Sequence, residues 1–265
     1  MSENSYDAAL DLLRRLNPSH VSQNLLNLTK LNPEISEDLL SSVDIPLGTA
    51  TDPQSNRKFL TCDYNRDLDS FRSPWSNEYF PKLDDDESYK PTGKIRELEI
   101  KLNNAFDNYR DLYYEGGVSS VYVWNDEESG DIDDGFSGVV LIKKTNDGNE
   151  WDSIHVIEVI KETASTFEYK ITSTIILSLQ DDKELNLNGN LIRQNSKTLR
   201  YENELSHIVN IGSFIEDIES NLRNLLQQVY FDKNKDIVSE LRSVVDLDQV
   251  QQDKLKHKEV IDALN

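Results

Sequence analysis

Residues 206–229 read "SHIVNIGSFIEDIESNLRNLLQQV", and their large aliphatic side chains recur alternately three and four positions apart. The recurring residues are Ile208, Ile211, Ile215, Ile218, Leu222, Leu225 and Val229. This spacing predicts a helix with a heptad seam, in which apolar residues repeat every 3.5 positions on average. A helix that packs only within its own globular domain more often follows a period of 3.6. We therefore expect a long helix, running to about Val245, with a defined partner surface. That partner is the chain's own sheet, a second copy or a different chain.

Five segments of β character precede this helix, separated by acidic or Gly-Asn turns. They are "VSSVYVW" (118–124), "FSGVVLIKK" (136–144), "WDSIHVIEVIK" (151–161), "STFEYKITSTIILSL" (165–179) and the weaker "LNLNGNLIRQN" (185–195). Sequential antiparallel strands are the simplest topology for segments joined in this way.

A further helix is predicted before the strands, over "GKIRELEIKLNNAFDNYRDLYYEGG" (93–117). Its apolar positions recur at helical spacing: Leu98, Leu102, Ala105, Phe106, Tyr109 and Leu112. Gly116 and Gly117 follow as a natural C-terminal cap. Helices combined with one antiparallel sheet place the chain in the α+β class.

The first fifty residues predict three short helices. Asn-Pro pairs at 17–18 and 32–33 mark the starts of the second and the third. From 45 to 92 this pattern disappears, because the segment holds five of the seven prolines. The chain thus divides into a helical part at 1–46, an irregular loop-rich region at 47–93, a helix plus antiparallel sheet at 94–196, the long helix at 197–245 and a polar tail with a short amphipathic end at 246–265.

Composition narrows the possible partners. The 28 Lys and Arg residues face 49 Asp and Glu residues, a net charge of −21. This charge argues against nucleic acid and anionic membranes, because both need a basic face. No run approaches the roughly 18 apolar residues of a membrane span, and we expect no signal peptide. Cys62 is the single cysteine, which favours a reducing, cytosolic compartment.

The stretch "CDYNRDLDSFRSPWSNEYFP" (62–81) combines acidic, basic and aromatic residues in the manner of a functional site. Its alternating oxygen-bearing residues are Asp63, Asn65, Asp67 and Asp69. A calcium loop of the EF-hand type needs glycine at its sixth position and glutamate at its twelfth. Leu68 and Pro74 occupy those positions, so we expect no metal here.

Catalytic chemistry finds little support in the sequence. No histidine lies near Cys62 in the chain, and we expect this cysteine to be a buried structural residue. The sequence contains neither a phosphate-binding glycine loop nor a Cys/His zinc cluster. These features favour a non-enzymatic interaction protein that needs no cofactor.

Eight blocks of sequence stand in the order of one known family, and the similarity runs from about Tyr6 to the end of the chain. They are "ALDLLRRL", "DLLSSVD", "CDYNRD", "SFRSPWSN", "NNAFDNYRDLYYEGGVSSVYVW", "GVVLIKK", "WDSIHV" and "VYFDKNKDIV". Together they resemble the β subunit of the heterodimeric F-actin capping protein. The resemblance implies an N-terminal three-helix stalk, an antiparallel sheet continued across the heterodimer, a long C-terminal helix and a short amphipathic terminal segment, the tentacle.

The function that the resemblance implies is capping of actin filaments. Members of this family bind the barbed end and block subunit addition and loss there, without calcium and without severing. An α subunit of similar fold is the implied partner in an obligate heterodimer, which makes the seven aliphatic residues of the heptad seam the expected interface. The implied location is the cytoplasm and the cortical actin cytoskeleton.

The resemblance also assigns actin-binding residues in the tentacle. The expected apolar anchors are Val260, Ile261 and Leu264, and the expected positive charges facing acidic actin are Lys254, Lys256 and Lys258. The sequence ends at Asn265, sooner than the often basic tail of the family. A shorter anchor implies a larger share of the binding for the α subunit.

Regulators that carry a basic capping-protein-interaction motif are a further implied partner. Arg15 and Tyr79 stand at positions that the family uses to bind this motif. We add Asp44, Asp63 and Asp67 on charge grounds only, because a basic motif needs acidic receivers.

Two alternatives stay open at the level of the sequence. One is an enzyme whose site is the loop at 62–81, which turnover without actin would support. The other is a structural module, unrelated to actin, that homodimerises through the heptad seam.

Overall fold

The computed structural model describes residues 2–17, 20–36, 39, 43–84, 86, 88–125, 132, 134–180 and 186–228. The chain divides into two compact units, Met1–Ile215 and Glu216–Asn265, so the boundary falls inside the last described helix. The packing of helices on the sheet that is described in this subsection belongs to the first unit. Across the described ranges, every helix is too short or too polar to cross a membrane.

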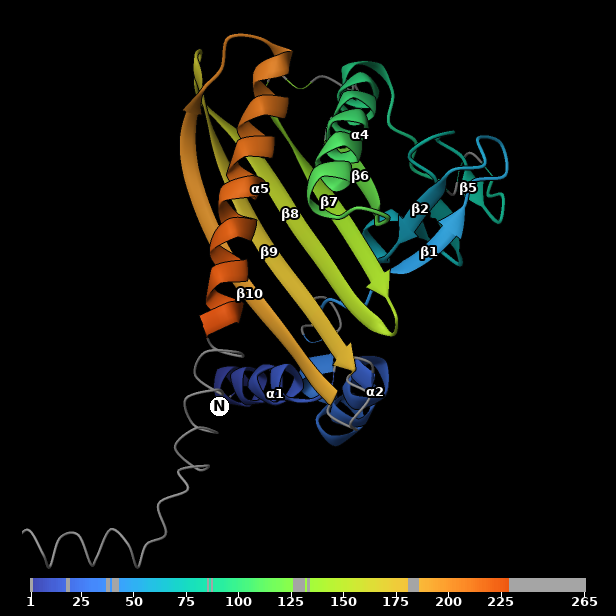
Figure 1. Cartoon of the computed structure of the whole chain (residues 1–265), viewed down its shortest axis with the longest axis vertical. Helices are drawn as coiled ribbons and strands as arrows, with labels where there is room; N and C mark the ends of the chain where they lie inside the picture. Colours follow the sequence, from blue (N-terminus) through green and yellow to red (C-terminus); the bar gives the residue numbers. More distant parts are fainter. Residues whose placement is uncertain are drawn as a thin grey trace, which may run out of the picture. The chain divides into compact units, whose positions relative to one another are not determined.

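The centre of the first unit is a five-stranded antiparallel sheet in which each strand pairs with the next along the chain (Figure 1). Its strands are β6 (Val118–Trp124), β7 (Gly135–Asn146), β8 (Asn149–Thr163), β9 (Thr166–Gln180) and β10 (Asn186–Arg200). The predicted sequential topology is therefore confirmed, and β6 has the predicted bounds. β10 runs five residues beyond the predicted segment, because its polar end pairs with the start of β9.

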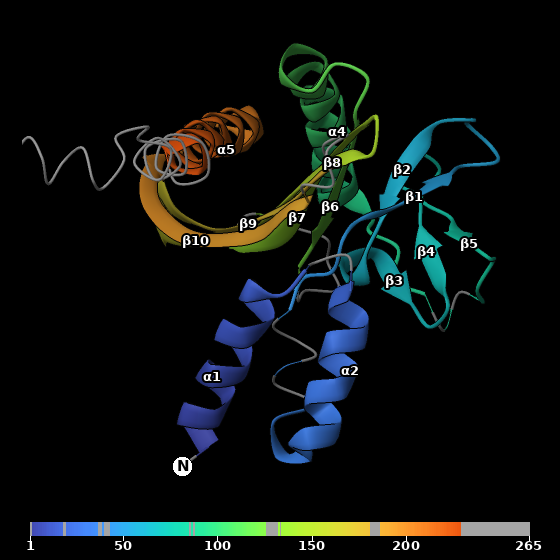
Figure 2. The same ribbon diagram turned by 60° about the horizontal axis from the view of Figure 1, so that its bottom comes forward.

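Two helices lie over one face of this sheet, and the N-terminal helices lie on the other side (Figure 2). The covering helices are α4 (Gly93–Tyr113) and the first half of α5 (Glu204–Leu226), up to Ile215. At the start of α5, His207 is fully buried against the rings of Phe136 and Phe167. The Tyr169 hydroxyl lies 2.8 Å from His207 Nδ1, which fixes the start of α5 on β9.

Helix α4 closes the outer edge of β6. An edge strand leaves backbone N–H and C=O groups without partners unless another element covers it. Here the Asn103 side chain accepts from the Val121 N–H at 2.9 Å and donates to the Val121 carbonyl at 2.8 Å. Glu99, one turn earlier, accepts from the Val123 N–H at 2.9 Å. Two polar side chains of α4 therefore take the place of a further strand.

This arrangement corrects the predicted apolar face of α4. Leu98, Leu102 and Phe106 are buried as expected, but Leu112 is 79% exposed, so its assignment to the buried face was wrong. The buried face instead includes the polar residues Glu99 and Asn103, because the β6 edge requires hydrogen-bonding partners.

The N-terminal region contains α1 (Ser2–Arg15), α2 (Val21–Leu31) and a 3₁₀ turn, η2 (Pro33–Ile35). These elements share a small apolar core made of Ala9, Leu13, Leu25, Ile35 and Leu39. The first two predicted helices are thus present. The third extends into positions outside the described residues and stays a prediction.

The region predicted as irregular contains only short elements. These are β1 (Gly48–Thr51), β2 (Lys58–Thr61), the 3₁₀ turn η3 (Asp63–Asn65), β3 (Arg66–Asp67), β4 (Ser70–Arg72) and β5 (Tyr79–Phe80). β1 and β2 form a hairpin, and β3, β4 and β5 form a separate small sheet. Leu47, Leu60 and Cys62 pack with Tyr122 and Val139 in one apolar cluster, which joins this region to the main sheet.

Asp52, at the turn after β1, ties two loops together. One carboxylate oxygen accepts from the backbone N–H of Gln54 at 2.7 Å and of Ser55 at 3.3 Å. The other accepts from the Ser73 hydroxyl at 2.7 Å and the Ser76 N–H at 3.1 Å. Burial alone would raise the pKa of Asp52, but these hydrogen bonds outweigh it and lower the pKa from 3.8 to about 2.

A lowered carboxyl pKa makes the fold sensitive to acid. The charged form of Asp52 stabilises the folded state at pH values above 3.8, and this contribution is lost as the pH falls toward about 2. A shift of this size corresponds to about 2 kcal/mol. Asp52→Asn should therefore lower the free energy of unfolding at pH 7 by about this amount and flatten its decline between pH ~4 and ~2. Urea unfolding followed by tryptophan fluorescence at several pH values measures both effects.

The exposed Asp69 provides the matched control, since Asp69→Asn removes the same charge from the same region. Equal stability and equal pH dependence in the two variants would contradict the role assigned to Asp52.

Candidate functional site

A buried ion pair organises the surface that carries the sequence 62–81. The Arg72 guanidinium donates to both carboxylate oxygens of Glu99, at 2.8 and 2.7 Å. Arg96 donates to the same carboxylate, and Arg72 also donates to the Asn77 side chain at 2.8 Å. Burial would lower the pKa of Arg72, but the charge of Glu99 outweighs it and raises that pKa. The guanidinium of Arg72 therefore keeps its charge in the pair.

Asn65 holds the backbone of this region from the inside. Its side-chain amide donates to the carbonyls of Leu60 and Arg72, at 3.2 and 3.0 Å, and to the Tyr122 hydroxyl at 2.8 Å. Its side-chain oxygen accepts from the Cys62 N–H at 2.9 Å. All four interactions are internal, so the Asn65 side chain holds together the backbone of β2, η3 and β4.

Tyr79 and Asp67 clamp the segment that precedes α4. The Tyr79 hydroxyl donates to one oxygen of Asp67 and lies 2.9 Å from the Tyr89 carbonyl. The same Asp67 oxygen accepts from the Tyr89 N–H at 3.1 Å. Tyr79 is only 3% exposed, and its burial, together with the hydrogen bond to Asp67, raises its pKa. The clamp places Asp67 and Tyr89 side by side at the surface.

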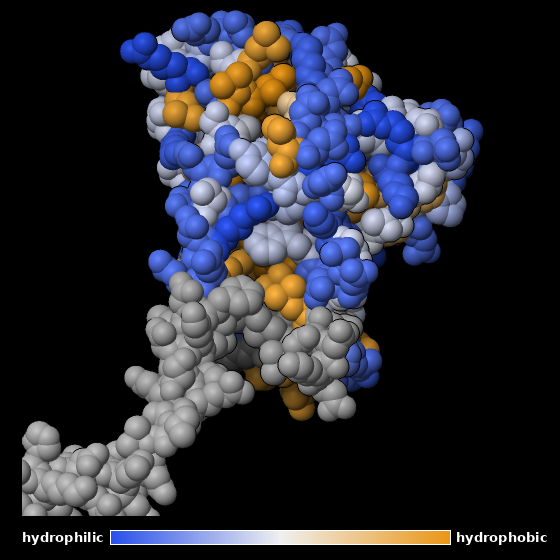
Figure 3. Space-filling view, viewed as in Figure 1, coloured by the Kyte–Doolittle hydropathy of each residue, from blue (hydrophilic) through white to orange (hydrophobic). Residues whose placement is uncertain are grey.

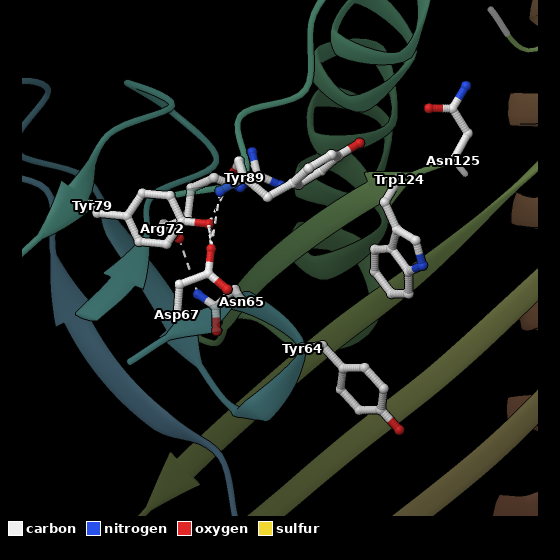
Figure 4. A pocket seen from close by; sticks show the side chains of 8 residues that line it. All are labelled: Tyr64, Asn65, Asp67, Arg72, Tyr79, Tyr89, Trp124 and Asn125. Atoms are coloured by element: carbon white, nitrogen blue, oxygen red, sulfur yellow. Dashed lines mark hydrogen bonds between the residues drawn. The ribbon is translucent and has the colours of Figure 1, made fainter. Parts of the chain in front are cut away.

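These side chains line a pocket with a volume of about 260 Å³. Its lining consists of Tyr64, Asn65, Asp67, Arg72, Tyr79, Tyr89, Trp124 and Asn125 (Figure 4). The rings of Tyr64 and Trp124 are nearly parallel, with centroids 6.3 Å apart and an interplanar angle of 13°. Trp124 comes from the end of β6, whereas Tyr64 comes from η3, so the main sheet and the loop region both contribute.

Acidic groups surround this pocket. Asp44 accepts from the Tyr64 hydroxyl at 3.4 Å and from the Thr174 hydroxyl, and burial raises its pKa. Asp63 is 53% exposed and lies 3.1 Å from Arg66. Asp67 forms part of the pocket wall. Arg72 and Arg96 share the Glu99 carboxylate, and Arg66 pairs with Asp63. The carboxylates of Asp44, Asp63, Asp67 and Glu99 therefore outnumber the three guanidinium groups by one.

The structure thus brings together four of the five residues predicted to bind a regulatory motif: Asp44, Asp63, Asp67 and Tyr79. Arg15 is the last residue of α1, and its side chain lies outside what the structure describes. The binding role of all five stays a prediction.

The residues of the heptad seam differ in burial. Ile211, Ile215, Ile218 and Leu222 are already buried in the single chain, whereas Ile208 and Leu225 are half-buried. Val229 lies outside the described residues, as do the predicted actin-binding residues from Lys254 to Leu264. The interface and actin-binding assignments therefore stay predictions.

The face that carries α4 and α5 is largely hydrophilic, but apolar side chains gather over the start of α5 (Figure 3). The exposed apolar residues of that stretch are Leu205, at 58%, and Val209, at 64%. Neither belongs to the predicted seam, because the seam was predicted from the alternating three- and four-residue spacing and these two positions fall outside it.

The alternating acidic residues of the sequence do not converge on one point. Asp63 pairs with Arg66, Asn65 is turned inward and Asp67 binds Tyr79. Cys62 is buried as predicted, and burial raises the pKa of its thiol to about 12, which makes it a poor nucleophile at neutral pH.

Sequence reasoning missed Glu99, Tyr89 and Trp124 as parts of this site. Glu99 lies on the apolar face of a predicted helix, and a charge in that position is a signal that could have been used. Tyr89 and Trp124 lie 27 and 62 residues after Cys62 in the chain, so only the fold brings them to the pocket.

Comparison with known proteins identifies a family. The family model described as "F-actin capping protein, beta subunit" matches residues 6–238. A protein from Yarrowia lipolytica named F-actin-capping protein subunit beta is 51% identical over 265 residues, covering 100% of both chains. A protein of the same name from Drosophila melanogaster is 50% identical over 267 residues, covering 97% of this chain and 94% of that one.

The fold also resembles a solved structure. The homodimeric actin capping protein alpha subunit from Plasmodium berghei superposes with a TM-score of 0.54 at 15% sequence identity. The match covers 93% of this chain and 99% of that chain. At this low identity the likeness concerns the fold alone.

Proposed function

The chain belongs to the F-actin capping protein β-subunit family, and we propose that it caps the barbed ends of actin filaments as one half of a heterodimer. The observation that carries this proposal is the match of nearly the whole chain to β subunits with about half of their residues identical. Capping works by occupation of the filament end, so it requires contact surfaces and no catalysed reaction, calcium or cofactor. The cytoplasm and the cortical actin cytoskeleton are the places where this function is needed.

The partner in this proposal is a capping protein α subunit. β10 is 15 residues long and, within the described residues, pairs with β9 alone, so its other edge carries backbone groups available to a further strand. Continuation of the sheet by the α subunit at this edge would satisfy those groups. The exposed Leu205 and Val209 of α5 offer apolar surface to the same partner.

The heptad seam supplies the rest of the proposed interface. Its residues are Ile208, Ile211, Ile215, Ile218, Leu222, Leu225 and Val229. Because several of them are buried in the single chain, the half-buried Ile208 and Leu225 are the members best able to reach the α subunit.

Contact with actin is assigned to the C-terminal tail. Val260, Ile261 and Leu264 would enter an apolar groove of the terminal actin subunit, while Lys254, Lys256 and Lys258 would face its acidic surface.

Co-expression with an α subunit tests the whole proposal. A 1:1 heterodimer that stops elongation from filament seeds supports it, and a folded heterodimer that leaves elongation unchanged overturns it.

Deletion of residues 254–265 should weaken capping and leave the heterodimer intact. The deletion removes three aliphatic anchors, and each fully buried side chain of this kind contributes roughly 1.5–3 kcal/mol to the binding free energy. Allowing for incomplete burial, we expect the Kd for filament ends to rise by at least about tenfold. Seeded elongation with pyrene-labelled actin measures the Kd, and size-exclusion chromatography checks the heterodimer.

A matched variant separates apolar from charged contributions. Val260→Ala, Ile261→Ala and Leu264→Ala together keep the three lysines and should reproduce most of the loss. Unchanged affinity for filament ends in both variants would show that the tail does not contact actin. Binding to the filament end would then be a property of the α subunit.

Regulation by a basic peptide is the second part of the proposal. The acidic surroundings formed by Asp44, Asp63 and Asp67 suit such a peptide, with Tyr79 holding Asp67 in place. Arg15, the last residue of α1, is the fifth residue assigned to this binding.

Substitution of Arg15 and Tyr79 together by Ala should abolish binding of a synthetic capping-protein-interaction peptide and spare capping. Asp63→Asn, which removes one exposed charge, should weaken peptide binding by about twofold to fivefold. Fluorescence anisotropy of the labelled peptide with the heterodimer measures both. Asp69→Asn is the control for Asp63, and an equal loss in that variant would mean that only general acidity matters.

A further inference from the structure

We propose that Arg193 and Lys197 of β10 select the strand that continues the sheet, and that the strand they accept carries carboxylates. β10 forms one edge of the five-stranded sheet (Figure 1). The inference rests on the proposed heterodimer and adds the chemistry that distinguishes its α subunit from a second copy of this chain. The direction of the backbone groups, the exposure of the strand and the sign of its charges carry it.

The backbone groups that reach the open edge belong to the even-numbered residues of β10. Alternate residues of an antiparallel strand direct both backbone groups to the same side. Directly after β10, the Tyr201 N–H binds the carbonyl of Ser165, in the turn before β9, at 2.9 Å. Odd-numbered residues of this part of the chain therefore face β9, and even-numbered residues face the open edge.

Two of these outward carbonyls already accept a side chain of the same chain. Arg193 Nη1 lies 2.9 Å from the Ile192 carbonyl oxygen. Asn210 Nδ2, from α5, lies 3.0 Å from the Arg200 carbonyl oxygen. The residues between these positions whose backbone groups face the edge are Gln194, Ser196 and Thr198. A further strand would pair with this stretch.

Both faces of the same stretch are exposed. Residues 193–198 are all exposed, although successive residues of a strand point to opposite faces of the sheet. Lys197 stands on the face that carries α5, because it is opposite Tyr169, whose hydroxyl lies 2.8 Å from His207 of α5. Arg193, four residues earlier, stands on the same face. The two cations therefore lie beside the place of a partner strand.

The charges of β10 are all positive. Its 15 residues include Arg193, Lys197 and Arg200 and no aspartate or glutamate, in a chain with a net charge of −21. Arg200 stands on the other face, diagonally from Glu168 of β9, so it already has an acidic neighbour. The β9 residues opposite the other two cations are uncharged: Ser173 and Tyr169. Carboxylates on the next strand would meet these two cations, and opposite charges across a strand pair are stabilising.

The two cations differ in their distance from the edge. The guanidinium of Arg193 binds an edge carbonyl, whereas the ammonium of Lys197 lies 4.7 Å from the centroid of the Phe214 ring of α5. A carboxylate on the partner strand therefore meets Arg193 more directly, and we expect Arg193 to have the larger share in the selection.

The same charges disfavour a second copy of the chain. Two copies of β10 that pair antiparallel are related by a two-fold axis. An axis at residue 195 places Arg193 of each copy opposite Lys197 of the other, and an axis at residue 197 places the two Lys197 side chains opposite each other. An axis at residue 196 makes these two lysines diagonal neighbours. Like charges directly opposite destabilise a strand pair, so a strand with Asp or Glu at these positions is preferred.

Subunit exchange in the heterodimer tests this selection. A donor on the β subunit and an acceptor on the α subunit lose energy transfer when excess unlabelled heterodimer is added, and the rate of loss is the dissociation rate. Salt screens the attraction between opposite charges. We therefore expect the wild-type heterodimer to dissociate at least about threefold faster in about 0.5 M than in about 0.05 M NaCl.

Charge reversal gives the sharpest variant. Arg193→Glu together with Lys197→Glu should speed dissociation at least about tenfold and reverse the effect of salt, because salt then screens a repulsion. Arg193→Gln together with Lys197→Gln should speed dissociation less and remove most of the salt effect, with the larger share due to Arg193→Gln. Lys58→Glu together with Lys161→Glu changes the net charge equally at exposed positions on β2 and β8, and should leave both the rate and its salt dependence unchanged.

The outcomes separate this selection from the proposed function. Equal dissociation rates in the reversal and control variants, or an unchanged salt dependence in the reversal variant, would overturn it. Native mass spectrometry of a wild-type preparation with the β subunit in excess should show no β homodimer, and a β homodimer would overturn the discrimination against a second copy. A heterodimer that caps filaments but dissociates regardless of these charges refutes the selection alone, whereas failure to form any heterodimer refutes the proposed function.

Discussion

The carboxylate of Glu99 is buried at the point where the loop region, α4 and β6 meet, and it accepts from all three. Arg72 reaches it from β4, Arg96 from its own helix and the Val123 N–H from β6. A buried ion pair of this kind contributes little net stability when complete, but removing one partner leaves an uncompensated charge and costs about 3–5 kcal/mol. Its main effect is therefore to fix where the loop region sits on the sheet.

The candidate site follows from this constraint. Once Arg72 is held by Glu99, its backbone carbonyl is in reach of Asn65, which in turn holds the turn that carries Tyr64. Val123 is the neighbour of Trp124, so the hydrogen bond that the Val123 N–H donates to Glu99 also positions the Trp124 ring beside Tyr64. The pocket is thus assembled by internal polar contacts, and its exposed acidic and aromatic groups remain available to a partner.

The sequence was sufficient to locate those helices and strands whose apolar residues recur periodically or form one continuous run. The β segments and the helix ending before Gly116 could be located because their apolar residues recur at fixed spacing. Glu99 and Asn103 could not be assigned, because their burial depends on an unpaired strand edge that only the folded sheet creates. The sequence analysis rejected a calcium loop at 63–69 because of Leu68 and Pro74, but it could not show that Asn65 turns inward and that Asp67 pairs with Tyr79, since both contacts depend on the fold.

Hydrogen exchange of the heterodimer carrying Glu99→Gln tests most directly whether this one carboxylate holds the site together. The account predicts that amides in 58–61, 70–72 and 121–123 exchange at least about tenfold faster, because the local free energy of opening falls. The N-terminal helices α1 and α2, and all segments of the exposed control Glu97→Gln, should exchange at the original rates. Unchanged protection of both the loop region and β6 in Glu99→Gln would contradict the account.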